Sequence, residues 1–193
     1  MITEWGRKNL RWLFEALARV LQALHLTPNA ITLIGTLLSV VVAYFIMTDR
    51  LLVAGLIYFV ASVTDALDGT LARMAGVRSR FGAFWDSTLD RLSEAIVVSS
   101  IGYWAALQGN MPGLAISLAA LVTSFMVSYT RARAEGLGIE SKVGFGTRVE
   151  RFIILLIALL VGYPIVGLAV IAVLAGITTV MRIYDVWRQT RET

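Results

Sequence analysis

Four of the six aspartates in this chain lie within 26 residues of an otherwise strongly apolar sequence. Asp65 and Asp68 are three residues apart, and Asp86 and Asp90 are four apart. On a helix, both spacings place the two side chains on one face. Four carboxylates that converge in an apolar site would repel one another unless a cation lies between them. Their oxygen-only chemistry suits one or two Mg²⁺, Mn²⁺ or Ca²⁺ ions rather than zinc.

A simpler interpretation is that these acids pair with arginines and only hold helices together. The arginines near enough in the sequence are Arg73, Arg78, Arg80 and Arg91. We favour a functional site, because ionisable residues inside membrane segments are rare and usually mark function.

Small residues and a cation accompany the acids. Gly69 directly follows Asp68, and Gly82 lies one helical turn before Asp86. Glycine lets a backbone or a ligand approach where a Cβ would clash. With Arg73 as a fixed cation, glycines and a metal form a set of groups suited to a diphosphate. A metal held on a diphosphate is the equipment for substitution at phosphorus.

The composition predicts that these groups sit in a membrane protein. The chain has 193 residues, of which 58% are hydrophobic and 16% charged, with a mean hydropathy of +0.76. A soluble domain carries about 25% charged residues. Cysteine is absent, which excludes disulfides, thiolate chemistry and cysteine-ligated metals.

Six apolar stretches approach the ~20 residues that cross ~30 Å of hydrocarbon. They are residues 29–48, 51–72, 84–107, 113–130, 147–163 and 165–181. Pro164 divides the last two, which a shallow re-entrant hairpin would also explain. We expect an all-α membrane protein of six transmembrane helices, in which Thr27 and Pro28 begin the first.

An amphipathic pattern over residues 4–26 predicts an interfacial helix before these spans, although a helix packed on a neighbouring subunit would show the same pattern. The prediction is a single domain over residues 1–193. It comprises an interfacial helix (1–27), a six-helix bundle (28–183) and a cytoplasmic tail (184–193).

Charge predicts the orientation of the bundle. With six spans, sixteen of the seventeen Lys and Arg residues, all but Arg50, fall on one side with both termini. The positive-inside rule makes that side the cytoplasm. We therefore expect a multi-pass protein of the cell membrane whose active site and termini are cytoplasmic.

The stretch from Asp65 to Asp90 reads D-x2-D-G-x2-A-R-x8-G-x3-D-x3-D, and it resembles the signature of the CDP-alcohol phosphatidyltransferases at all eight fixed positions. The expected spans and interfacial helix also fit that family. The resemblance implies an enzyme of phospholipid biosynthesis that transfers a phosphatidyl group from CDP-diacylglycerol to an alcohol and releases CMP.

The resemblance also implies a role for each matching residue. Asp65, Asp68 and Asp86 would ligate two Mg²⁺ or Mn²⁺ ions. Asp90 would contribute at the edge of the metal site and act as the base that deprotonates the acceptor hydroxyl. The residues expected to contact CDP-diacylglycerol, or an ether-lipid analogue, are Asn29, Ala30, Ile31, Thr32, Gly69, Arg73, Ser79 and Gly82. Family membership further implies a homodimer, and no nucleic-acid partner is expected.

A second basic region bears on the acceptor. Five arginines and a lysine would exceed the needs of a neutral alcohol, and they suit an acceptor that carries its own phosphate. These candidates are Arg131, Arg133, Lys142, Arg148, Arg151 and Arg182. The alternative is that they anchor the helices at the membrane interface.

The segments "SYTRARAE" and "RVER" resemble the phosphatidylinositol phosphate synthase branch of the family, which includes archaetidylinositol phosphate synthases. Arg131 departs from the Lys found in part of that branch. The branch implies inositol 1-phosphate as acceptor, whereas charge alone equally permits glycerol 3-phosphate and a phosphatidylglycerophosphate synthase. An ion or proton transporter is an alternative of another class, but it would scatter its acids over several spans.

Overall fold

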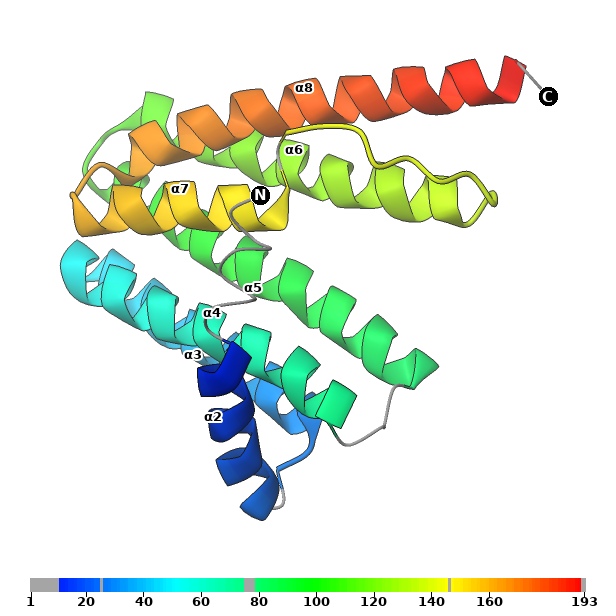
Figure 1. Cartoon of the computed structure of the whole chain (residues 1–193). Coiled ribbons are helices and arrows are strands. Elements are labelled where there is room, and N and C mark those ends of the chain that lie inside the picture. The colour runs from blue at the N-terminus through cyan, green and yellow to red at the C-terminus, as the bar shows by residue number, and fades with distance from the viewer. Residues whose placement is uncertain (1–10, 25, 75–78, 146, 192–193) are drawn as a thin grey trace.

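The computed structural model describes residues 11–24, 26–74, 79–145 and 147–191, and every regular element within them is an α-helix (Figure 1). The all-α prediction is therefore confirmed for these ranges. Most of the segment predicted as an interfacial helix is described from Arg11 onward, while residues 1–10 and His25 lie outside. The helices are α2 (Arg11–Ala23), α3 (Pro28–Met47), α4 (Leu51–Met74), α5 (Arg80–Leu107), α6 (Met111–Glu135), α7 (Arg148–Leu160) and α8 (Pro164–Arg191).

Polar caps define where several helices begin. The Thr27 hydroxyl accepts a hydrogen bond from the Ala30 N–H at 3.2 Å, and Pro28 occupies the first turn of α3, as the sequence predicts. The Asn110 side chain accepts from the Gly113 N–H at 2.9 Å at the start of α6. Such caps satisfy N–H groups that the first helical turn leaves without a partner.

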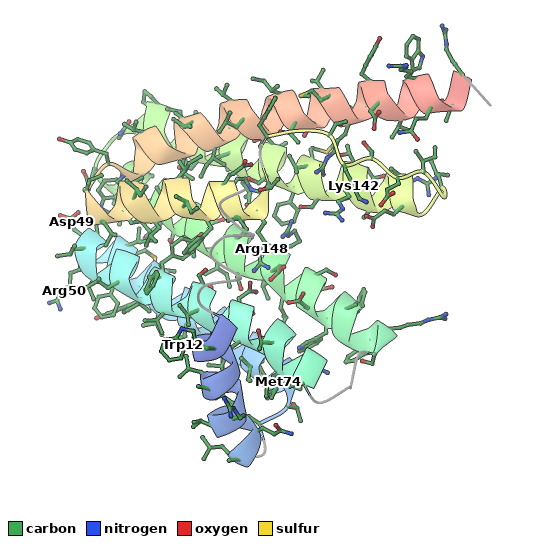
Figure 2. All side chains as sticks on the ribbon, viewed as in Figure 1. Trp12, Asp49, Arg50, Met74, Lys142 and Arg148 are labelled. Carbon is green, nitrogen blue, oxygen red and sulfur yellow. The ribbon has the colours of Figure 1, made fainter. Side chains whose placement is uncertain are left out.

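Tight turns lie at one end of the molecule. Asp49, Gly109 and Gly162 adopt positive φ angles of 59°, 71° and 80° in the connections after α3, α5 and α7. Figure 2 places Asp49 and Arg50 at the opposite end of the molecule from Lys142, which lies in the loop between α6 and α7. The turns and the basic loop thus lie at opposite ends, as the alternating topology requires.

The apolar core lies toward the tight-turn end. There α3 packs on both α4 and α5, α5 packs on α6, α6 packs on α8, and α7 packs against α4 and α8. The buried side chains that join these helices are Val42, Ile46, Ala54, Val97, Val98, Ile101, Ala120, Leu155, Leu159, Leu168 and Ile171. Their burial closes this end of the bundle and leaves polar residues to line the helices farther along.

Several helices extend past the predicted apolar stretches. Beyond the apolar stretch 113–130, the chain continues as helix to Glu135, so the connection to α7 begins only at residue 136. Arg131 Nε lies 2.9 Å from Glu135 Oε1, an (i, i+4) ion pair that favours helix. Charged residues with good helix propensity prolong α6 and α8 beyond the apolar pattern.

Within the part of the chain that the structure describes, four helices are long and apolar enough to cross a bilayer: α3, the Leu51–Leu71 part of α4, α6 and α8. The chain is accordingly a multi-pass membrane protein. The helices at the other two expected spans, α5 and α7, are not in this group for physical reasons. Helix α5 is long but carries five charged side chains. Helix α7 has 13 residues, which at ~1.5 Å per residue extend only ~20 Å.

Candidate active site

Three of the four predicted metal ligands come together between α4 and α5. Asp65, Asp86 and Asp90 each offer a carboxylate oxygen, and these oxygens lie within 4.8 Å of one another. The two helices both pack on α3 and present the three acids toward each other. All three side chains are partly buried, and a set of hard oxygen donors fits a divalent cation such as Mg²⁺ or Mn²⁺. Asp68 lies one turn beyond Asp65 on α4, but its side chain is outside the described part.

Arg148 bridges this carboxylate cluster from the first residue of α7. Its Nη2 lies 2.6 Å from Asp65 Oδ1 and 2.5 Å from Asp90 Oδ1. The start of α7 is fixed by a capping box, in which the Thr147 N–H donates to the Glu150 carboxylate at 2.8 Å. Figure 2 shows Arg148 directed from this end of α7 toward α5. A guanidinium held here offsets part of the repulsion among the acids.

The alternative of arginine–acid pairing is therefore present in the structure, although the closest contacts come from Arg148, which was not among the arginines named for it. Arg148 was predicted for acceptor binding, yet it makes the close contacts with the acids. Of the arginines named for helix pairing, Arg91 lies 3.8 Å from Asp90 Oδ2. A structural role and a catalytic role for these carboxylates are compatible, since an ion pair can hold an acidic site together until a cation binds.

The predicted nucleotide-binding residues lie where α3 and α5 begin. Ser79 caps α5, accepting from the Gly82 N–H at 2.8 Å. A Cβ added at Gly82 would lie 3.0 Å from Ser79 Oγ and 3.4 Å from Asn29 Oδ1. The Trp85 indole N–H donates to the Asn29 carbonyl at 3.3 Å. The structure thus brings Asn29, Ser79 and Gly82 together, as the sequence analysis expected.

The remaining residues of that set are placed differently. Ile31 is buried against Leu71, so its side chain belongs to a small apolar cluster rather than to an open surface. The Ala30 N–H completes the cap of α3, and the Thr32 hydroxyl donates to the Pro28 carbonyl at 3.0 Å. Gly69 is partly buried on α4, and the Arg73 side chain lies outside the described part.

A cavity of about 510 Å³ opens beside the acids and connects them to two arginines. Asp65, Asp90, Arg148 and Arg151 all line it, together with the carboxylate of Glu94. Hydroxyl groups supply much of its remaining polar lining: Thr32, Thr36, Ser39, Tyr58, Ser62 and Ser93. Most of the remaining wall is apolar, so the groups that could bind a phosphate and alcohol groups are the few acids, guanidinium groups and hydroxyls.

The six candidate acceptor-binding residues do not all reach this cavity. Arg148 and Arg151 line it. Arg182 is buried behind it and donates to the backbone carbonyls of Val143 at 3.2 Å and Val127 at 2.5 Å. Arg131 and Arg151 both lie near enough to Arg182 to repel it electrostatically, but Arg131 pairs with Glu135 and Arg151 pairs with Glu94.

The other two candidates lie on exposed polar segments. Arg133 is exposed at the end of α6. The Lys142 ammonium lies 2.5 Å from Glu140 Oε1 in the 136–147 loop, and this hydrogen bond holds the pKa of the Glu140 carboxyl below its usual range. Lys142 is thus already paired with an acid of its own loop.

Sequence reasoning missed two residues of the cavity. Glu94 lies one turn beyond Asp90 on α5, and the structure pairs it with Arg151 at 2.9 Å. Tyr58 was not considered, although it precedes Asp65 by seven residues on α4 and therefore shares its face. Helical spacing from the known aspartates was the signal that could have found both.

Together, the fold and the site define a class of protein: a helical, multi-pass membrane enzyme that gathers hard-cation ligands and guanidinium groups at one cavity. A family model described as CDP-alcohol phosphatidyltransferase matches residues 25–182. The chain belongs to this family of enzymes.

Named relatives extend the comparison. The chain is 37% identical over 180 residues to an archaetidylinositol phosphate synthase of Pyrococcus horikoshii, covering 93% of each chain. It is 37% identical over 183 residues to the phosphatidylinositol phosphate synthase of Mycobacterium tuberculosis (strain H37Rv), covering 89% of this chain and 84% of that one.

Solved structures of the mycobacterial enzyme are similar in fold. The crystal structure with CDP-DAG bound has a TM-score of 0.84 and 34% identity, covering 90% of this chain and 93% of that chain. The structure in complex with manganese and citrate has a TM-score of 0.85 and 34% identity, covering 90% and 88%.

Proposed function

We propose that this enzyme transfers a phosphatidyl group from CDP-diacylglycerol, or an ether-lipid analogue, to a hydroxyl of inositol 1-phosphate and releases CMP. The observation that carries the proposal is the single cavity that joins Asp65 and Asp90 to Arg148 and Arg151. The carboxylates would bind a metal that contacts the diphosphate of CDP-diacylglycerol, and the guanidinium groups would bind the phosphate of the acceptor. The named relatives, which make inositol phosphate lipids, support this choice of acceptor.

Asp65, Asp68, Asp86 and Asp90 are the residues that would hold two Mg²⁺ or Mn²⁺ ions. Such ions, when bound, would draw charge from the diphosphate and stabilise CMP as it leaves. The close approach of Asn29, Ser79 and Gly82 supports a nucleotide position beside this cluster. Ala30, Ile31, Thr32, Gly69 and Arg73 complete the proposed CDP-lipid contacts, with Ile31 contributing through its backbone.

Asp90 is the proposed general base. It lines the cavity, and its Oδ1 lies beside Arg148, where a hydroxyl of a phosphate-bound acceptor could approach. The acceptor oxygen attacks the phosphorus bonded to diacylglycerol, Asp90 takes the hydroxyl proton, and the bond from that phosphorus to the CMP oxygen breaks.

Arg148 and Arg151 are the strongest candidates for the acceptor phosphate, because both line the cavity. Arg131 and Arg182 are further candidates, because Arg182 lies near both Arg131 and Arg151. Arg133 and Lys142 remain proposed contributors, and they would have to reach the acceptor from exposed segments.

The proposal is tested by an acceptor panel. Purified enzyme in detergent with CDP-diacylglycerol and Mn²⁺ should release CMP when inositol 1-phosphate is added, and not with free inositol or serine. Stimulation by glycerol 3-phosphate alone would instead identify a phosphatidylglycerophosphate synthase. A chain that releases no CMP with any acceptor, yet moves ions across vesicles, would be a transporter.

The membrane arrangement is part of the same proposal. We infer one domain over residues 1–193 with six spans in which α5 and α7 complete the four apolar helices. Helix α2 would lie in the membrane interface, and the active site and both termini would face the cytoplasm. The amphipathic sequence of α2 and the gathering of basic residues at one end support this, and a homodimer is expected from the family.

A further inference from the structure

Glu94 occupies a position in the cavity that the proposed reaction has not used. It lies one helical turn beyond Asp90 on α5, and its side chain is partly buried. Its Oε1 accepts a hydrogen bond from Arg151 Nε at 2.9 Å, and its Oε2 accepts from Arg151 Nη2 at 3.3 Å. Both oxygens of one carboxylate therefore hold one edge of one guanidinium group.

Arg151 needs such a partner because of where it lies. Its side chain is only 4% exposed, and burying a cation without a compensating charge is strongly unfavourable. Arg148 and Arg182 add further positive charge nearby. A two-point contact with a carboxylate fixes the plane of a guanidinium group, which a single contact would leave free to rotate.

Glu94 also connects Arg151 to the catalytic aspartate. Its Oε2 lies 3.9 Å from Arg91 Nε, and Arg91 Nη2 in turn lies 3.8 Å from Asp90 Oδ2. Arg91 also donates to the Ser128 hydroxyl on α6. Glu94 thus lies between two arginines, one beside the proposed base and the other on the cavity wall contributed by α7.

We propose that Glu94 is a positioning residue for acceptor binding: it orients Arg151 so that this guanidinium meets the phosphate of the acceptor alcohol in the cavity. This inference rests on the proposed function, because it takes a phosphorylated acceptor as the ligand. It assigns Glu94 no contact with CDP-diacylglycerol and no proton transfer. Its effect should therefore appear in the binding of one substrate only.

The test compares Glu94→Gln with the wild-type enzyme in CMP-release assays that vary CDP-diacylglycerol and inositol 1-phosphate separately. Loss of a hydrogen-bonded charge should raise the KM for inositol 1-phosphate by on the order of tenfold or more. The KM for CDP-diacylglycerol and the kcat should stay near their wild-type values. Glu94→Asp keeps the charge on a shorter side chain and should recover part of the loss.

Asp49→Asn is the matched control. It also replaces a carboxylate by an amide, but in the tight turn after α3, where Asp49 Oδ1 accepts from the Trp104 indole N–H at 2.9 Å. Asparagine keeps that acceptor and tolerates the positive φ of residue 49. Both KM values of this variant should be unchanged.

Three results would overturn the inference: an unchanged KM for inositol 1-phosphate, a rise of both KM values together, or a lower KM for inositol 1-phosphate. The second would assign Glu94 a purely structural role, and the third would make it a competitor of the acceptor for Arg151. If Glu94→Gln does not fold, Glu94→Asp decides by the same comparison. If inositol 1-phosphate does not stimulate CMP release by the wild-type enzyme, the proposed function itself is refuted.

Discussion

At the residue scale, Asp90 lies between the carboxylate cluster and the arginines of the site. Its Oδ1 lies 2.5 Å from Arg148 Nη2, and its Oδ2 lies 3.8 Å from Arg91 Nη2, while Asp65 and Asp86 lie within the same cluster. The side chain is 9% exposed. A carboxylate between the proposed metal ligands and the proposed phosphate-binding arginines is well placed to accept a proton from a hydroxyl that is delivered with its phosphate.

Asp90→Asn should therefore abolish turnover while leaving the binding of CDP-diacylglycerol largely intact. The amide keeps an oxygen for the contact with Arg148 but cannot serve as base, and loss of a general base costs about 10²- to 10⁴-fold in rate. CMP release gives the rate, and titration with CDP-diacylglycerol in the presence of Mn²⁺ gives the affinity.

The comparison variant for this prediction is Asp68→Asn, which should weaken the binding of metal and of CDP-diacylglycerol together. If Asp90→Asn also lost the nucleotide lipid, Asp90 would be an essential metal ligand first, and its assignment as base would lose its support.

Which residues of the site could be predicted depends on how far apart the interacting residues lie in the sequence. The three aspartates are recognisable because helical spacing and the family signature fix their relation. Arg148 and Asp65 are 83 residues apart, and Arg151 and Glu94 are 57 apart. No local pattern encodes which arginine faces which acid, because this depends on how α7 packs against α4 and α8.

At the scale of the elements, α7 is the helix whose placement matters most. It is short, yet its first turn carries both cavity arginines. Glycines on its two neighbours allow it to pack closely: a Cβ at Gly55 on α4 would lie 2.9 Å from Leu160 Cδ2, and one at Gly167 on α8 would lie 2.4 Å from the Ala158 Cβ. These contacts near the far end of α7 help to fix where its first turn lies.

Gly167→Ala should destabilise the protein by about 1–3 kcal/mol, because overpacking forces α7 and α8 apart. Gly176→Ala is the control on the same helix: its added Cβ would meet only Thr123 Cγ2, at 3.8 Å, an ordinary contact. That variant should be neutral or slightly stabilised by better helix propensity. Thermal unfolding in detergent compares the two, and equal stability would contradict the packing account.

Helix starts were more predictable than helix ends. Thr27 and Pro28 predict the start of α3, because Thr27 is a polar cap and Pro28 has no N–H that needs a partner. The end of α6 was placed too early, because hydropathy decreases at Arg131 while the backbone continues as helix to Glu135. Hydropathy reports the apolar part of a span, and helix propensity carries the chain beyond it.

At the scale of the whole molecule, the cavity adjoins the apolar core. Val97, Val98, Leu155 and Ile171 belong to the core and also line the cavity, whose polar lining includes Asp65, Asp90, Arg148 and Arg151. The composition predicted a helical membrane protein. The cavity itself could not be predicted, since it is formed by residues of α3, α4, α5, α7 and α8 that meet only in the folded bundle.

The proposed orientation predicts a labelling pattern. The sequence has no cysteine, so single substitutions Arg50→Cys and Lys142→Cys can be compared directly. Both positions are exposed. In intact cells, a membrane-impermeant maleimide should label only the Arg50→Cys protein, and permeabilised cells should allow both to react. Labelling of Lys142→Cys alone in intact cells would reverse the orientation.

The most direct test of the central claim follows the acceptor oxygen. The enzyme is incubated with CDP-diacylglycerol, Mn²⁺ and inositol 1-phosphate whose free hydroxyls carry ¹⁸O. The masses of the products are then measured by mass spectrometry. Phosphatidyl transfer predicts an inositol phosphate lipid that retains every ¹⁸O atom, together with unlabelled CMP. Absence of this lipid, or ¹⁸O in CMP, would contradict attack by the acceptor hydroxyl on the lipid-bound phosphorus.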